Sequence, residues 1–264
     1  MIKSEFEINF SLMQELKMLG WLMESRFSST TSIGVNENAN FSHGSNETSV
    51  IIGSEWKPVF AALSDRDILL YDTAPVSREE WTSPVQAHPL IATRLVVKNT
   101  ENQTNPDSLF VFSTRTGSKY GIEMHTFGVY MSSEYNSWCQ AIIDGSHESV
   151  ETAKEVVVTC RWNSKDCRLT LHYDKGISLH LKQSANTQQN VSTSSLNRKN
   201  LGPLLWHYPY ECLKSTSDYA PNILWIDFGD ETLMELDMLG CPKPVVFILH
   251  NILSAKLRRK GIAL

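Results

Sequence analysis

The sequence predicts a mainly β protein with some helix, built as two consecutive units in which several strands precede one closing helix. Three observations lead to this prediction: short strand-like runs bounded by turn residues, one helical pattern at the end of each half, and the repetition of that order. At 264 residues, with 41% hydrophobic and 20% charged residues, the chain is long enough for two domains that each bury a core.

The first half is dominated by short runs that read as strands. At Ser132 the pattern changes, because Tyr135, Trp138 and Ile142 share one face at helical spacing, and a serine N-cap is expected ahead of Glu134. Many strands followed by one closing helix is the sequence order of a pleckstrin-homology barrel. The expected strands are Lys17 to Glu24, Trp56 to Leu63, Asp67 to Tyr71, Leu90 to Val97, Leu109 to Ser113 and Gly121 to Val129.

The second half repeats this order, and its helix is expected to begin near Pro242, with Pro244 in the first turn. The fold class is therefore mainly β with α: two tandem pleckstrin-homology-like barrels, over 1–153 and 154–264, each closed by a C-terminal helix. Polar loop insertions are expected at about 28–54 and at 184–202. The expected strands are Glu155 to Cys160, Cys167 to Tyr173, Ile177 to Lys182, Ile223 to Phe228 and Thr232 to Leu236.

Charge and composition exclude several classes of function. Residues 1–150 hold 10 Lys+Arg against 18 Asp+Glu, a net charge of −8, while the remainder holds 14 against 11, a net charge of +3. An acidic first half argues against nucleic acid as a partner. The longest apolar run, Val245 to Leu249, is too short to span a bilayer, and acidic residues interrupt any N-terminal signal segment. A cytoplasmic location is expected.

The sequence predicts no enzyme, no cofactor and no structural metal. The five cysteines lack any CxxC pair and read as reduced thiols. A metal site at Cys160, Cys167 and a histidine is the alternative, but the usual ligand spacing is missing. No glycine-rich phosphate loop or nucleophile elbow is present, and Ser254 four residues after His250 reads as a coincidence of helical spacing.

Several segments in one order carry a resemblance to a known family. They include Trp56 to Leu63, Asp67 to Asp72, His88 to Val96 and, near the C-terminus, Cys241 to His250. The chain resembles the C-terminal half of a syntrophin, a pleckstrin-homology domain followed by the syntrophin-unique region. A complete syntrophin also has a PDZ domain and a split first pleckstrin-homology domain, which no segment here matches.

This resemblance implies a peripheral membrane adaptor. Such a scaffold protein would bind a helical segment of dystrophin or dystrobrevin, link the membrane-associated dystrophin complex to the actin cytoskeleton, and lie at the cytoplasmic face of the plasma membrane.

The expected partner site is in the second unit and includes its closing helix. The apolar surface from Val245 to Leu257 is wider than one barrel opening requires, so it is either exposed to a partner or packed against the first unit. Cations at its end would form a rim that steers an acidic partner. The partner-binding candidates are Lys243, Phe247, His250, Lys256, Leu257, Arg258, Arg259 and Lys260.

A phosphoinositide-directed membrane module is the alternative function, acting through Lys17, Arg26 and Lys57 of the first unit. Val59 stands where strong binders place an arginine, so weak and unselective lipid binding is predicted, with solvated surface cations as the simpler reading. Trp81, in a polar insertion between strands, is expected to pack as a lid over the barrel. Its alternative role is an aromatic anchor for a partner.

Overall fold

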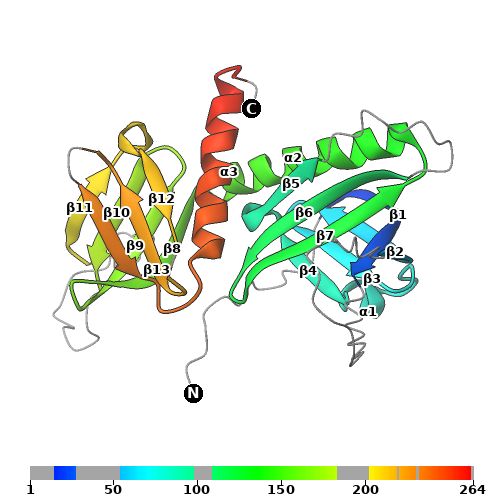
Figure 1. Ribbon diagram of the computed structural model, residues 1–264, viewed down its shortest axis with the longest axis horizontal. Coiled ribbons are helices and arrows are strands. Elements are labelled where there is room, and N and C mark those ends of the chain that lie inside the picture. The colour runs from blue at the N-terminus through cyan, green and yellow to red at the C-terminus, as the bar shows by residue number, and fades with distance from the viewer. Residues whose placement is uncertain are drawn as a thin grey trace, which may run out of the picture.

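The computed structural model describes residues 15–27, 54–97, 109–182, 202–218, 220–229 and 232–262. These residues form two seven-stranded antiparallel sheets, each followed by a long helix (Figure 1). The prediction of a mainly β protein with two pleckstrin-homology-like units is confirmed. Hydrogen bonding among the described strands leaves two edge strands in each sheet, so the sheets are not closed barrels. The polar loops predicted at 28–54 and 184–202 lie almost wholly outside the described residues.

The strands of the first sheet follow the apolar runs of the sequence, in the spatial order β4-β3-β2-β1-β7-β6-β5. The run expected as one strand over Leu90 to Val97 is divided, because a 3₁₀ turn, η1 (Leu90–Ala92), takes its first three residues. The short β4 was not predicted from the sequence. The strands are β1 Leu16–Phe27, β2 Ser54–Ser64, β3 Asp67–Tyr71, β4 Gln86–Pro89, β5 Thr93–Val97, β6 Phe110–Ser118 and β7 Gly121–Val129.

Strand β3 is buried along its whole length because both faces of the sheet are covered there. Ile68 and Leu70 belong to the main core of the first unit, whereas Leu69 and Tyr71 belong to a smaller cluster on the opposite face. Trp81 packs on that smaller cluster, with its ring 5.6 Å from that of Tyr71.

The two helices of the first unit differ in how their N-termini are capped. Helix α1 (Arg78–Trp81) has a conventional N-cap, since the Ser77 side chain accepts a hydrogen bond from the backbone N–H of Glu80. Helix α2 (Ser132–Ala153) begins after Met131, which makes no side-chain capping bond. The serine N-cap expected ahead of Glu134 was therefore wrong: Ser132 and the residue after it already lie inside the helix.

The second sheet repeats the plan of the first, in the order β11-β10-β9-β8-β14-β13-β12. A two-residue turn at Asn163 and Ser164, both with positive φ, joins its first hairpin. The short β11 and β12 were not predicted. The strands are β8 Glu155–Trp162, β9 Lys165–His172, β10 Gly176–Leu181, β11 Leu204–Tyr208, β12 Ser215–Ser217, β13 Ile223–Asp227 and β14 Leu233–Asp237, and the 3₁₀ turn η2 covers Tyr210–Cys212.

Alternation along the strands of the second sheet points their larger apolar side chains inward. In the first hairpin Cys160 lies opposite Cys167 and Val158 opposite Leu169, all of them buried. All five cysteines of the chain are free. Helix α3 (Lys243–Arg259) completes the chain and stands between the two sheets in Figure 1. None of the described helices is long and apolar enough to cross a membrane.

Candidate protein-interaction surface

Helix α3 carries all of the partner-binding candidates except Lys260, which caps its C-terminal end. The helix begins after Pro242, with Pro244 in its first turn, where a missing N–H costs no hydrogen bond. Lys256, Arg258 and Arg259 lie in its last turn, where the helix dipole favours positive charge.

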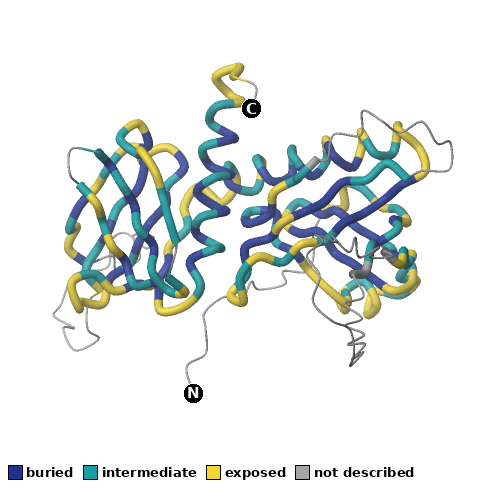
Figure 2. The backbone as a smooth tube through the Cα atoms, in the orientation of Figure 1, coloured by how far each residue is buried: buried dark blue, intermediate teal, exposed yellow. Residues whose placement is uncertain are grey.

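The apolar surface of α3 is buried on two sides. Val245, Ile248 and Ile252 belong to the core of the second unit, and the helix also packs on α2, η1, β5 and β6 of the first unit. Figure 2 shows the buried stretch along most of α3 and the exposed residues gathered at its C-terminal end. Of the two outcomes expected for this wide apolar surface, the structure has the packing against the first unit.

Asn251 is the centre of this packing, and nothing in the sequence marked it. Its side chain is 3% exposed, and the two N–H groups of its Nδ2 are shared among the carbonyl oxygens of Leu90, Ile91 and Thr93, at 3.2, 3.0 and 3.0 Å from that nitrogen. Gly117 of β6 allows the close approach of the helix start, because a Cβ there would lie 2.6 Å from the carbonyl oxygen of Lys243. The acceptors and the close contact are backbone atoms, so they leave little trace in residue types.

A polar cluster extends the junction toward the end of α3. His147 of α2 and Ser254 share a hydrogen bond of 2.9 Å, and Arg258 pairs with Asp144. Burial opposes ionisation of Asp144, but hydrogen bonds from Gln140 and Arg258 outweigh it and lower the pKa of that carboxyl. Ser254 thus pairs with His147 and not with His250.

Most cations of the predicted rim already have partners within the chain. Lys243 forms an ion pair of 2.7 Å with Asp218, while Lys256 donates to the carbonyl oxygen of Tyr173 at 2.9 Å and lies 5.0 Å from that ring. Arg259 lies 6.0 Å from the same ring. Lys260 is exposed, and no described residue forms an ion pair with it.

The remaining partner candidates differ in how far they can reach solvent. Phe247 is 7% exposed and belongs to the core of the second unit, whereas Leu257 is half-buried. Burial, and then the positive charge of Arg94, lower the pKa of His250 to about 4. His250 is therefore neutral at pH 7. The outer surface available to a partner is the exposed end of α3.

Each lipid candidate whose side chain is described pairs with a carboxylate of its own unit. Lys17 pairs with Glu148 of α2, and Lys57 pairs with Asp72 at 2.7 Å. Arg26 lies in β1, but its side chain is outside the described part of the chain. Val59 is 4% exposed and belongs to the core. The two described cations do not converge on one anion site.

Trp81 packs against the outer cluster of the first unit, as the lid interpretation expects. Its backbone oxygen accepts a hydrogen bond from the Tyr71 hydroxyl at 2.9 Å, and its ring lies 6.2 Å from Phe60. Trp21 continues the same cluster and is 53% exposed. The exposed aromatic ring on this face is therefore Trp21.

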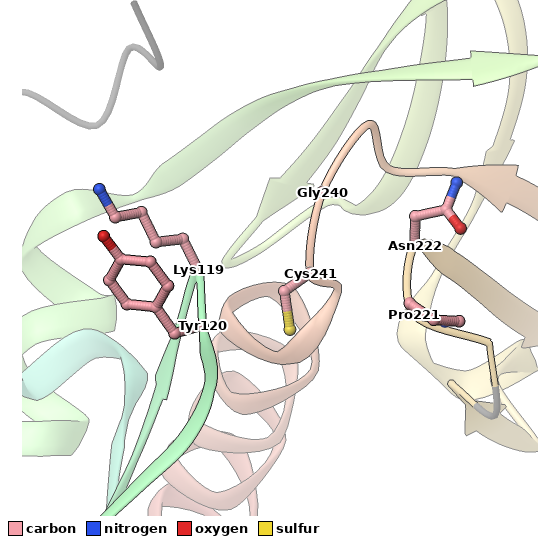
Figure 3. A pocket seen from close by; sticks show the side chains of 6 residues that line it. All are labelled: Lys119, Tyr120, Pro221, Asn222, Gly240 and Cys241. Carbon is pink, nitrogen blue, oxygen red and sulfur yellow. The ribbon is translucent and has the colours of Figure 1, made fainter.

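A shallow open groove of about 570 Å³ lies between the units at the start of α3. Figure 3 shows Lys119 and Tyr120, at the β6–β7 turn, on one side of it and Pro221 and Asn222 on the other, with Cys241 between them. The Lys119 ammonium lies 4.9 Å from the Tyr120 ring. No group of three metal-binding side chains gathers here or elsewhere in the described residues.

The sequence model of the family described as Syntrophin C-terminal PH domain matches residues 151–262, the second unit with α3. Beta-2-syntrophin of Homo sapiens is 39% identical over 210 residues, which make up 79% of this chain and 36% of that protein. This chain belongs to the syntrophin family. Syntrophin-1 of Caenorhabditis elegans is 34% identical over 215 residues, 79% of this chain and 44% of that protein.

The resemblance predicted from the sequence is thus confirmed, and the chain is a syntrophin-like protein of an adaptor family. It spans less than half the length of these syntrophins. Among solved structures, the chain is similar to the PH domain of human pleckstrin homology domain-containing protein family A member 5. That likeness has 16% identity and a TM-score of 0.34, and it covers 55% of this chain and 88% of that domain.

Proposed function

We propose that this syntrophin-family chain is a non-enzymatic adaptor whose second unit binds a helical segment of dystrophin or dystrobrevin type. It would thereby link a membrane-associated dystrophin complex to the actin cytoskeleton at the cytoplasmic face of the plasma membrane. We also propose that the boundary between its two domains lies between residues 153 and 154. The observation that carries the proposal is the match of the second unit to the syntrophin family over 151–262.

The exposed end of α3 is the proposed contact surface. Arg259 and Lys260 are exposed there, next to half-buried Leu257. Cations at the rim of an interface mainly raise the association rate and the salt dependence of binding. Two buried side chains of α3, Phe247 in the core of the second unit and Asn251 at the junction with the first, hold this surface in place and do not touch the partner.

The test is the binding of a labelled dystrophin-type helical peptide to the full chain. Deletion of 241–264 would remove the eight buried residues of α3 and unfold the second unit, so point variants are the sharper tool. We expect Arg259→Glu with Lys260→Glu to weaken binding about tenfold and to reduce its salt dependence.

The matched control is Arg78→Glu with Lys165→Glu, which changes the net charge equally at two exposed sites outside α3. Equal affinity of the rim variant and the wild type would remove the rim from the site. Absence of any binding by the wild-type chain would contradict the proposed partner class.

Weak lipid binding by the first unit stays a prediction. The two lipid candidates whose side chains are described, Lys17 and Lys57, are each paired with a carboxylate, and the net charge of the first half is −8. Sedimentation with phosphoinositide vesicles checks it: head-group-specific binding that Lys57→Ala abolishes would show that the lipid site is stronger than these pairs suggest.

A further inference from the structure

Two arginines lie directly opposite each other on the outer face of the first sheet. Arg94 of β5 pairs in register with Arg115 of β6, and Arg115 pairs in register with Met124 of β7. Their neighbours Thr93 and Thr116 are buried and hydrogen-bonded to each other at 2.8 Å on the inner face. The strand alternation therefore turns both arginines outward, and both are exposed.

This arrangement is unfavourable in the isolated chain. Side chains directly opposite on antiparallel strands have Cβ atoms about 5 Å apart, and like charges at that spacing destabilise the sheet. None of the ion pairs among the described residues includes Arg94 or Arg115. Burial, with the charge of Arg115, lowers the pKa of Arg94. Among the described residues, no carboxylate forms an ion pair that would offset the repulsion of this pair.

Exposed apolar side chains flank the arginines on the same hairpin. Met124, in register with Arg115, is 50% exposed, and Ile122, in register with Gly117, is 46% exposed. Beyond them, Tyr120 at the β6–β7 turn is 83% exposed. Arginine, methionine and tyrosine are the residue types enriched where proteins meet, while lysine is depleted there.

We propose that the outer face of β5, β6 and β7, centred on Arg94 and Arg115, is a docking surface for an acidic segment of a protein partner. Carboxylates of the segment pair with the two guanidinium forks, which match carboxylate geometry bidentately. An apolar side chain of the segment covers Met124 and Ile122. The proposal rests on the proposed function for the partner being a protein, and it adds a surface on the first unit.

Net charge favours a short acidic segment over an anionic membrane. The first half of the chain carries −8, and a membrane surface presents its negative charge to the whole of that half. A short segment responds to charges within a Debye length of about 8 Å, where the arginine pair dominates. His250 of α3 is close enough for the Arg94 charge to lower its pKa, so the surface reaches the junction of the two units.

The experiment measures binding of two probe peptides to the full chain by fluorescence anisotropy. The first is a helical 20-mer with two Glu four residues apart beside a Leu stripe, and its matched peptide has Gln at both positions. The second probe is the dystrophin-type segment. We expect Arg94→Glu with Arg115→Glu to weaken binding of the Glu peptide more than about tenfold, while Arg78→Glu with Lys165→Glu leaves it within about twofold.

Two further variants keep the test independent of folding and of overall charge. Arg94→Gln with Arg115→Gln removes the cations without adding carboxylates, and it should also lose the preference for the Glu peptide over the Gln peptide. In the charge-reversed variant, a peptide with Lys in place of both Glu should restore binding. Urea midpoints report whether each variant is folded.

Each outcome decides one of the two proposals. Loss of Glu-peptide binding in both arginine variants supports the docking surface, whether or not the dystrophin-type segment binds; failure of that segment alone contradicts only the proposed function. Equal binding of Glu and Gln peptides to the wild type, or of the Glu peptide to wild type and variants, overturns the docking surface. Arginine-dependent binding to phosphatidylserine vesicles without Glu-peptide binding would assign the surface to lipid and overturn it too.

Discussion

The two units share one order of strands and helix but differ in what they bury. Ten of the thirteen buried polar residues among those described belong to the first unit, including Glu24, Asp67 and His88. The second unit buries only Thr170 in its own sheet; the other two, Asn251 and Ser254, bond to the first unit. The same fold order thus tolerates a polar interior in one unit and an almost wholly apolar interior in the other.

The polar residues of the first unit meet across its interior. His125 of β7 contacts Glu24 of β1 at 2.6 Å, and the His88 ring lies 4.4 Å from that of His125. The Nε2 atom of His88 is hydrogen-bonded to Gln86 at 3.2 Å, whereas its buried Nδ1 atom has no hydrogen-bond partner among the described residues. In the second unit, α3 supplies apolar side chains to the core and directs Asn251 and Ser254 to the junction with the first unit.

The largest expected effect is on stability and comes from substituting Asn251, which joins α3 to the first unit. In Asn251→Ala, the carbonyl of Ile91 loses its side-chain donor, while that of Leu90 keeps the backbone N–H of Thr93 and that of Thr93 keeps the Ser146 hydroxyl. An orphaned acceptor costs about 1 to 3 kcal/mol, and the lost bonds to the other two carbonyls add to this, so we expect a loss of about 3 kcal/mol in urea unfolding. Asn136→Ala, at an exposed site on α2, is the control and should change stability by less than about 0.5 kcal/mol. Equal effects of the two substitutions would contradict a junction held by Asn251.

The second effect concerns acid and belongs to the first unit. Burial, and then the charge of His125, lower the pKa of His88 to about 4, although Glu123 and Glu24 oppose this. Since the unfolded-state pKa is about 6.5, stability is full above pH 6.5 and falls as the unfolded state takes up a proton, down to about pH 4. We expect a loss of about 2 kcal/mol between pH 7 and pH 5 from this residue.

Urea unfolding at both pH values checks this expectation. In His88→Gln, the stability lost between pH 7 and pH 5 should be smaller by about 2 kcal/mol. In His207→Gln, at an exposed site on β11, the stability lost over the same pH range should equal that of the wild type. An unaltered pH dependence in His88→Gln would show that the polar interior does not set the acid sensitivity of the first unit.

Sequence reasoning reached the strands and the closing helices because their signals are local. Apolar runs gave β3 and β7 with their observed bounds, while β4 and β12 are too short to stand out. Strand β11 is as long as β3 and mostly apolar, but it was missed beside the polar segment 184–202. The wide apolar surface of α3 indicated burial on two sides. The choice between a partner and the first unit depended on backbone carbonyls of η1, which leave no trace in residue types, and on Gly117. A glycine within a strand indicates a close approach but does not identify the neighbour.

The candidate site was predictable to a smaller degree. The cations at the end of α3 could be found, but not their pairing with Asp144 or Tyr173, because those contacts join residues far apart in the chain. The register that places Arg94 opposite Arg115 could not be predicted from the sequence for a related reason. It depends on how β5 and β6 align across a long connection, and no turn motif fixes that alignment.

The smallest expected effect compares the arginine pair with the paired surface cations elsewhere. Arg115→Thr removes one of two like charges that face each other in register and places a residue of high strand preference at an exposed site. We expect a gain of about 0.5 kcal/mol, and a similar gain for Arg94→Thr. Because either substitution ends the repulsion, the double variant should gain little beyond the single ones. The double-mutant cycle then yields a coupling energy of the sign expected for repulsion. Added salt should stabilise the wild type more than any of the three variants.

Additive effects, or destabilisation in both single variants, would mean that the two guanidinium groups avoid each other in solution. A stability gain together with loss of acidic-peptide binding would instead show that the chain keeps an unfavourable pair for the sake of a partner, which the paired cations Lys17 and Lys57 do not do.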